Sequence, residues 1–160
     1  MEAKRDLSVS YNKLGDIAKA EGNLSEAKRY YKLCLDIFEA LVKETGTVKS
    51  KRDLSVSYNL LGDIAKAEGN LTEAKRYYTL CLEIAEALAK ETGTVEAYDD
   101  LALSYYNIAF CQTGFFSKRR KKREHLKKAL SIWERLSQAC PNVYEYARRR
   151  DIVKEALGIK

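Results

Sequence analysis

A segment of 47 residues occurs twice in succession in this chain. Residues 4–50 read KRDLSVSYNKLGDIAKAEGNLSEAKRYYKLCLDIFEALVKETGTVKS, and residues 51–97 match them at 39 of 47 positions. A third, diverged copy begins near Asp100 and contains LALSYYNIAF. Self-similarity at a period of about 20–50 residues is typical of proteins that stack one small structural unit on the next. The repeat therefore constrains the architecture far more than it constrains the chemistry.

Each repeat carries the signals of two helices joined by tight turns. Apolar residues in the first half recur at steps of three and four, which predicts a helix over about residues 3–20; they are Leu7, Tyr11, Leu14, Ile17 and Ala18. Gly22 is expected to end this helix, and Asn23 with Glu26 is expected to form a capping box for the next. That second helix should run to about Glu44, where Gly46 ends it. Because the joints are so short, the two helices should be antiparallel neighbours.

Glycine also occurs inside the first helix of each repeat, at Gly15 and Gly62. Glycine within a helix costs about 1 kcal/mol relative to alanine. A cost that recurs in both repeats suggests a packing reason, so we expect the second helix to approach closely at this point. Repeated apolar residues are expected in the core, among them Leu14, Ala27, Tyr31 and Leu35.

These positions resemble the tetratricopeptide repeat pattern of aromatic, Leu-Gly, turn glycine, alanine, aromatic and small residue. The first repeat matches at Tyr11, Leu14, Gly15, Gly22, Leu24, Ala27, Tyr31 and Cys34, and the second at Tyr58, Leu61, Gly62, Gly69, Leu71, Ala74, Tyr78 and Cys81. The third unit matches in part, at Tyr105, Ile108 and Ala109. The family usually has about 34 residues per unit. This repeat is longer, and Glu39 and Glu86 stand where the family has a closing proline, so the chain is similar to long-helix members found in bacterial multidomain proteins.

The resemblance implies an all-α protein, a right-handed α-solenoid of three antiparallel helical hairpins and a C-terminal capping helix, with seven helices. We predict one domain over residues 1–160, with units at about 1–47, 48–94 and 95–141 and the capping helix at 142–157. In the third unit the segment CQTGFFSKRRKKR is expected to form the turn. A natural start and a piece of a longer array both fit the first residues, which lie at a repeat boundary. The apolar surface of the first unit is expected to cause end-to-end self-association.

Composition argues against an enzyme, a cofactor site and a membrane span. The sequence has no glycine-rich phosphate loop, no nucleophile elbow, one histidine and no apolar run near 18 residues. The four cysteines lack metal-ligand spacing, which fits free thiols in a reducing cytoplasm; they are Cys34, Cys81, Cys111 and Cys140. Cys34 and Cys81, which occupy the same repeat position between leucines, are expected to be buried. The net charge of +6 lies entirely in residues 95–160, since residues 1–94 hold 15 basic and 15 acidic side chains.

The first candidate site is the concave face, which the first helix of each hairpin lines in tetratricopeptide arrays. The positions expected there are Asn12, Asp16, Lys19, Asn59, Asp63 and Lys66, followed by Tyr106, Phe110 and Thr113 in the third unit. Amides and aromatic rings are adaptable peptide contacts. The family's known clamp for a terminal carboxylate has no counterpart here, because Asp16 and Asp63 would repel a carboxylate. An ordinary solvated inner face is the alternative.

The second candidate site is a run of six cations that follows Phe115 and Phe116, namely Lys118, Arg119, Arg120, Lys121, Lys122 and Arg123. A solvated, mobile loop is the plain interpretation. The run precedes a helix, however, and a helix start favours anions, so nucleic acid, an acidic lipid surface or an acidic protein segment would fit.

The sequence thus predicts a protein–protein interaction scaffold that binds a peptide or partner helix on its concave face. Anion binding through residues 118–123 and a purely structural spacer in a larger protein are the alternatives. If the chain carries a specific function, we expect it where the repeats differ. The differing pairs are Lys13/Leu60, Ser25/Thr72, Lys32/Thr79, Asp36/Glu83, Phe38/Ala85, Val42/Ala89, Lys49/Glu96 and Ser50/Ala97.

Overall fold

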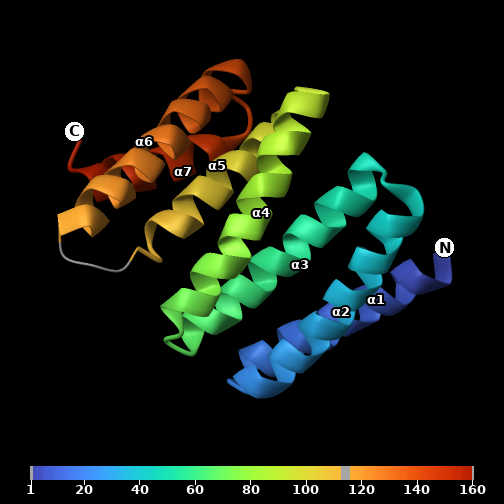
Figure 1. Ribbon diagram of the computed structural model, residues 1–160. Helices are drawn as coiled ribbons and strands as arrows, with labels where there is room; N and C mark the ends of the chain where they lie inside the picture. The colour runs from blue at the N-terminus through green and yellow to red at the C-terminus, as the bar shows by residue number, and fades with distance from the viewer. Residues whose placement is uncertain (1, 113–115, 160) are drawn as a thin grey trace. The chain divides into compact units, whose positions relative to one another are not determined.

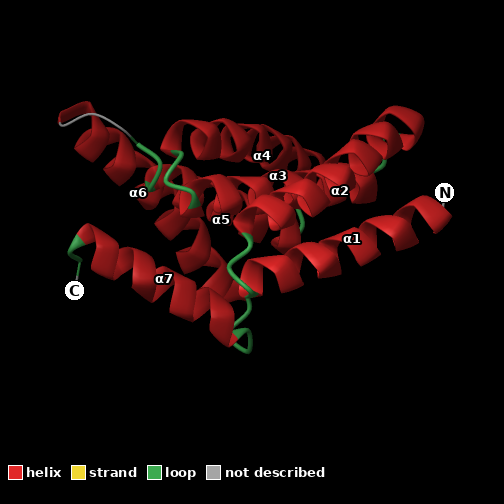
Figure 2. Cartoon of the chain, turned by 90° about the horizontal axis from the view of Figure 1, so that it is seen from below, coloured by secondary structure: helices red, strands yellow, loops and turns green. Residues whose placement is uncertain are grey.

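A computed structural model describes residues 2–112 and 116–159, with side chains from residue 119 in the second range, and these residues form helices, turns and loops without a strand (Figures 1 and 2). The described helices are α1 (Glu2–Ala20), α2 (Leu24–Thr45), α3 (Val48–Ala67), α4 (Leu71–Thr92), α5 (Val95–Ala109), α6 (Phe116–Ala139) and α7 (Tyr144–Leu157). The predicted all-α class with seven helices in helical hairpins is confirmed. Helix bounds recur at the interval of the sequence repeat, since α2 and α4 begin and end 47 residues apart.

The helix ends follow the predicted capping signals. The Asn23 side chain accepts a hydrogen bond from the Glu26 backbone N–H at 3.2 Å, and Gly22 has a φ of 78°. Asn70 accepts from the Glu73 N–H in the same way at 3.1 Å. The capping box differs from its expected form in one contact: the Glu26 carboxylate accepts from the Asn23 side-chain amide at 3.0 Å. The turns are therefore fixed by the repeated Gly-Asn pair and its glutamate.

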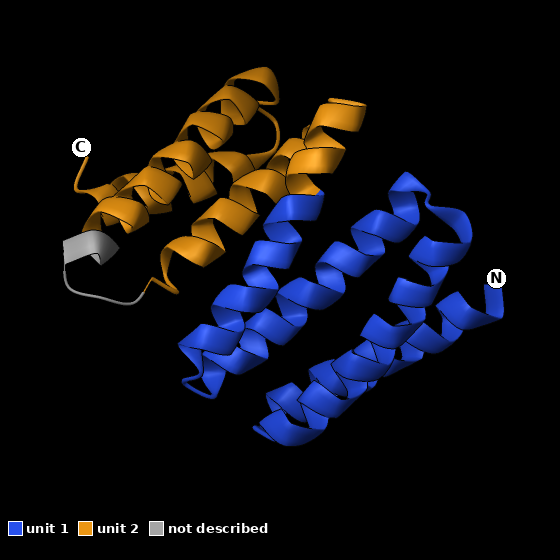
Figure 3. Ribbon diagram, viewed as in Figure 1, with its two compact units in different colours: residues 1–84 blue, residues 85–160 orange. Residues whose placement is uncertain are grey.

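The chain divides into two compact units, residues 1–84 and residues 85–160, with the boundary inside α4 (Figure 3). In unit 1, α1 packs against α2 and α2 packs against α3. In unit 2, α5 packs against α6 and α6 against α7. The single domain expected over residues 1–160 stays a prediction.

The two internal glycines mark where the helices of a hairpin come closest. A Cβ atom at Gly62 would lie 2.5 Å from a ring carbon of Tyr78, and one at Gly15 would overlap the Tyr31 ring in the same way. Both tyrosine side chains are fully buried. The predicted close approach is therefore real, and the missing side chain makes room for an aromatic ring.

The core of unit 1 draws buried side chains from α1 to α4, and most of them come from α2 and α3. Leu61 and Ile64 of α3 are fully buried against Ala27 and Tyr31 of α2. The prediction that Leu14 is a core residue is wrong, because its side chain is 42% exposed, whereas Leu61 at the same repeat position is 0% exposed. α2 covers this face of α3, and no described helix of unit 1 covers the same face of α1. Leu35 is partly buried.

Unit 2 is held together by a polar network around a buried tryptophan. The indole N–H of Trp133 in α6 donates to Asp99 Oδ1 of α5 at 2.7 Å. Arg149 of α7 donates to both oxygens of Asp99, each at 2.7 Å. Because one carboxylate from α5 accepts from α6 and from α7, the last helix is fixed to the third hairpin, as expected of a capping helix.

The predicted turn in the third unit is too long. α6 begins at Phe116, so the cations at 118–123 belong to its first two turns rather than to a loop. Arg120 pairs with Glu124 one turn later at 3.2 Å, and Lys122 Nζ lies 4.2 Å from the centroid of the Phe110 ring. Lysine and arginine are also good helix formers, so these contacts extend the helix against the unfavourable dipole.

Replacing Leu61 by Ala should lower the free energy of unfolding by about 2–5 kcal/mol, because the substitution leaves a cavity in the α2–α3 core. Leu14→Ala is the matched control, since it changes the same residue at the same repeat position on an exposed face, and it should cost far less. Urea unfolding followed by circular dichroism measures both. Equal losses in the two variants would contradict the assignment of the buried faces.

Candidate functional site

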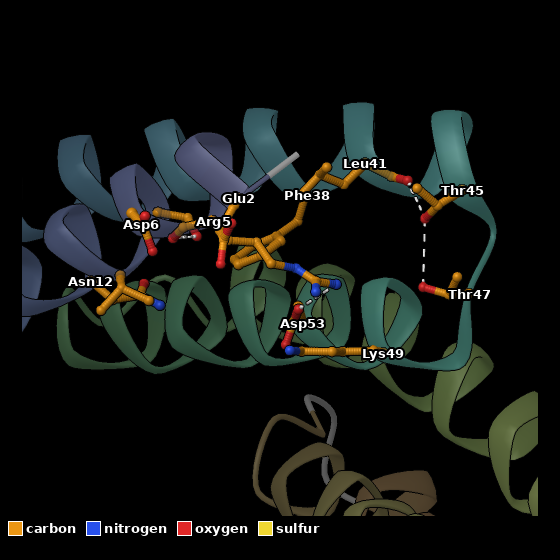
Figure 4. A pocket seen from close by; sticks show the side chains of 12 residues that line it. Glu2, Arg5, Asp6, Asn12, Phe38, Leu41, Thr45, Thr47, Lys49 and Asp53 are labelled. Atoms are coloured by element: carbon orange, nitrogen blue, oxygen red, sulfur yellow. Dashed lines mark hydrogen bonds and ion pairs between the residues drawn. The ribbon is translucent and has the colours of Figure 1, made fainter.

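Unit 1 contains a cavity of about 800 Å³ between α1, the end of α2 and the start of α3 (Figure 4). Its apolar wall comes from Val9, Phe38 and Leu41. Polar side chains surround this wall. The full lining is Glu2, Arg5, Asp6, Ser8, Val9, Asn12, Phe38, Leu41, Thr45, Thr47, Lys49 and Asp53. The cavity thus combines an apolar surface with charges of both signs, as many ligand sites do.

Two buried polar atoms of this lining have no hydrogen-bond partner among the described residues. They are Nε of Arg5, which is a donor, and Oδ1 of Asn12, which is an acceptor. Each unpaired buried polar group costs about 1–3 kcal/mol. Most buried polar groups in native proteins are paired, so an unpaired donor and an unpaired acceptor in one cavity make this end of unit 1 the candidate site.

The charges in the cavity are only partly balanced. Arg5 Nη2 lies 3.6 Å from Asp53 Oδ2, which is a loose ion pair. Burial raises the pKa of the Asp53 carboxyl, and Arg5, Lys49 and Arg52 oppose that shift. The carboxylate is therefore poorly solvated, and a donor from a ligand would stabilise it.

Of the six positions predicted for the groove in α1 and α3, only Asn12 lines the cavity. Asp16 and Asp63 instead accept hydrogen bonds from the hydroxyls of Tyr31 and Tyr78, each at 2.6 Å. Burial, followed by the bond to Asp16, raises the pKa of Tyr31. These aspartates therefore fasten the hairpins. Asn59 is half-buried, and Lys19 and Lys66 are exposed.

In unit 2 the predicted aromatic positions lie together. The ring centroids of Tyr106 and Phe110 are 5.0 Å apart, and those of Tyr106 and Trp133 are 6.0 Å apart. Both predicted residues are half-buried, with Lys122 over the Phe110 ring. The two rings pack within unit 2 and remain partly accessible to solvent. Thr113 and Phe115 lie outside the described residues.

The basic run presents most of its described cations to solvent. Arg119, Arg120, Lys121 and Arg123 are exposed, and Lys122 is half-buried. The side chain of Lys118 and that of Phe116 lie outside the described residues. These exposed cations occupy the first two turns of α6 and give the start of this helix a positively charged surface.

Apart from Asn12, none of the residues that line the cavity was predicted as a site residue. A usable signal was present for two of them. Phe38 and Lys49 are positions where the repeats differ, since the second repeat has Ala85 and Glu96 there. A site prediction based on the positions at which the repeats differ would have pointed to this end of unit 1.

The described residues hold no group of three or more His, Cys, Asp or Glu side chains arranged for a metal ion. All four cysteines are free thiols, and Cys34 donates to the Ser8 carbonyl at 2.9 Å. Burial raises the pKa of Cys34 to about 11, which disfavours the thiolate form at neutral pH. Among the described helices, none is both long and apolar enough to cross a membrane.

Paired antiparallel helices that recur along the chain define a helical repeat protein. The tetratricopeptide repeat model matches residues 8–40 and 56–88, which lie in the first and second repeats. The first two repeats of the chain are tetratricopeptide repeats. This family consists of non-enzymatic scaffolds that bind other proteins, which supports the general assignment as a protein-interaction scaffold.

Solved structures share this fold. The tetratricopeptide repeat domain of Arabidopsis FLU is 19% identical, with 82% of this chain and 98% of that chain covered and a TM-score of 0.56. The DHF79 filament chain is 15% identical, with 98% of this chain and 82% of that chain covered and a TM-score of 0.50. No curated protein sequence matches the chain.

Proposed function

We propose that unit 1 binds an extended segment of a partner protein in the cavity between α1, α2 and α3. The observation that carries this proposal is the pair of unpartnered buried atoms, Arg5 Nε and Asn12 Oδ1, in one cavity. Every residue of a peptide backbone offers a carbonyl acceptor and an N–H donor, so an extended segment that runs past both side chains would supply both missing partners.

The apolar wall of the cavity specifies the second feature of the ligand. Val9, Phe38 and Leu41 would surround one apolar side chain of the bound segment. Burial of such a side chain contributes about 1.5–3 kcal/mol. Asp53, poorly solvated and loosely paired, favours a further donor on the ligand over a carboxylate. The ligand is therefore an extended peptide with an apolar anchor and without a terminal carboxylate at this position.

The broader concave-face site stays part of the proposal. Its proposed residues in unit 1, beyond Asn12, are Asp16, Lys19, Asn59, Asp63 and Lys66, and its proposed residues in unit 2 are Tyr106 and Phe110. We propose that the protein is a scaffold made of one repeat domain and that it is not an enzyme. The free thiols support a reducing compartment such as the cytoplasm.

Selection of a random twelve-residue peptide library on the full chain tests the proposal. Asn12→Ala removes the buried acceptor and Val9→Asp places a charge in the apolar wall, so each should weaken a selected peptide at least tenfold. Fluorescence anisotropy of the labelled peptide gives the dissociation constants.

Val56→Asp is the matched control, because Val56 occupies the same repeat position and is about as exposed as Val9. It should leave peptide affinity unchanged. Equal effects of Val9→Asp and Val56→Asp, or peptides that bind both the parent and Asn12→Ala alike, would refute the cavity as the binding site.

A second candidate function is anion binding through the start of α6. Its support is the cluster of exposed cations, Arg119, Arg120, Lys121 and Arg123, in a region where the helix dipole and mutual repulsion disfavour positive charge. A bound anion would offset both the unfavourable helix dipole and the repulsion among the cations. Lys118 and Lys122 complete the proposed site.

Changing Arg119, Arg120, Lys121 and Arg123 together to Gln should shift elution from heparin to markedly lower salt, because polyanion affinity depends on the number of neutralised phosphates or sulfates. The control changes four exposed lysines of unit 1 to Gln, which alters the net charge equally; they are Lys13, Lys19, Lys32 and Lys43. If both variants elute at the same salt concentration, retention reflects net charge alone and the α6 site is excluded.

A further inference from the structure

The α1 face that points away from the cavity is apolar and open. Leu7, Leu14 and Ile17 are 46%, 42% and 55% exposed. They lie on the other side of α1 from Arg5 and Asn12, as their helical spacing requires. This surface, which we call the α1 outer face, is therefore separate from the site of the proposed function.

The second repeat shows what covers the same face when it is occupied. Leu54, Leu61 and Ile64 are the counterparts of the three exposed residues, and they are 9%, 0% and 0% exposed. Phe38 and Leu41 of α2 share a buried cluster with Leu54. Leu61 and Ile64 share another with Ala27 and Tyr31 of α2, to which Ala18 of α1 and Tyr77 of α4 also belong. An apolar α2 stripe thus fits this face.

Polar contacts flank the apolar stripe in the occupied copy. Tyr58 of α3 donates to Glu39 of α2 at 3.0 Å, and burial raises the pKa of Tyr58 to about 12. Lys28 of α2 bonds Glu68 at 2.8 Å and Glu73 at 3.0 Å, and these hydrogen bonds raise the pKa of Lys28. A helix that occupies the face therefore presents a lysine and, eleven residues later, a glutamate.

The residues that make these polar contacts with α2, Tyr58, Glu68 and Glu73, all have counterparts in the first repeat. Tyr11 corresponds to Tyr58, and none of the described carboxylates accepts its hydroxyl hydrogen. Glu21 corresponds to Glu68 and makes no ion pair with a described residue, while Glu26 corresponds to Glu73. One flanking position differs, since Lys13 stands where the second repeat has Leu60. Apart from this position, the α1 outer face carries the same side chains as the α3 face against which α2 packs.

We propose that the α1 outer face docks a helix of a partner protein that carries the α2 pattern, an aromatic and leucine stripe flanked by a lysine and a glutamate eleven residues apart. Burial of the three aliphatic side chains supplies affinity. The Tyr11 hydroxyl and the Glu21 carboxylate set register and orientation, through the glutamate and the lysine of the partner.

A synthetic peptide of residues 23–46 tests this docking on the full chain. A lactam between Lys32 and Asp36, both exposed in α2, keeps the peptide helical, and circular dichroism verifies it. Leu14→Glu in the chain should weaken binding at least tenfold without changing the melting temperature, because Leu14 lies on the open face.

Charge reversal separates docking in register from unspecific apolar contact. Lys28→Glu in the peptide should weaken binding severalfold, and Glu21→Lys in the chain should restore it. Glu44→Lys is the control variant in the chain, since Glu44 lies on α2 and outside this face, and it should restore nothing.

The outcomes either support or overturn the proposal. A helical peptide that does not bind, that binds Leu14→Glu as tightly as the parent, or that shows no rescue by Glu21→Lys overturns it. Sedimentation velocity without peptide tests the rival occupant. Concentration-dependent dimers that Leu14→Glu abolishes would show that a second copy of this chain occupies the face. Loss of docking with retained binding of library peptides leaves the cavity function intact.

Discussion

The close contact of a glycine with a tyrosine ring is the constraint on which each hairpin of the first two repeats depends. Tyr31 fills the space that Gly15 leaves open, and its hydroxyl reaches Asp16, the next residue along α1. Gly62, Asp63 and Tyr78 repeat this arrangement. The contact fixes both the spacing of the two helices and their register. The cavity wall and the covered faces follow from that register.

One repeated sequence gives different surfaces because its copies have different neighbours. The face that holds Leu61 in the core leaves Leu14 exposed on α1, although the two residues are in the same repeat position. Phe38 is buried beside the cavity of unit 1, where the second repeat has alanine at the matching Ala85. Identity of sequence therefore predicts local structure well, whereas exposure depends on position in the array.

Periodicity and caps were enough to predict the helices, because Gly22, Asn23 and Gly46 act through local backbone geometry. The cavity was harder to predict, because Arg5 and Asp53 are distant in sequence and meet only through packing of α1 on α2 and α2 on α3. Asp16 was predicted to face a ligand, and the hydrogen bond that its Oδ1 atom accepts from Tyr31 joins α1 to α2, which the repeat pattern did not indicate. The basic run was expected within the turn, whereas the ion pair of Arg120 with Glu124 and the contact of Lys122 with the Phe110 ring extend the helix through it.

Binding at a preformed cavity is the central claim, and side-chain NMR tests it most directly. The Arg5 Nε–H and Asn12 amide resonances of the full chain are followed while a library-selected peptide is added. The account predicts that both resonances shift as the peptide supplies the missing acceptor and donor, while the Asn59 amide resonance stays in place. Saturation of the chain with peptide while the Arg5 and Asn12 resonances remain unchanged would contradict the claim.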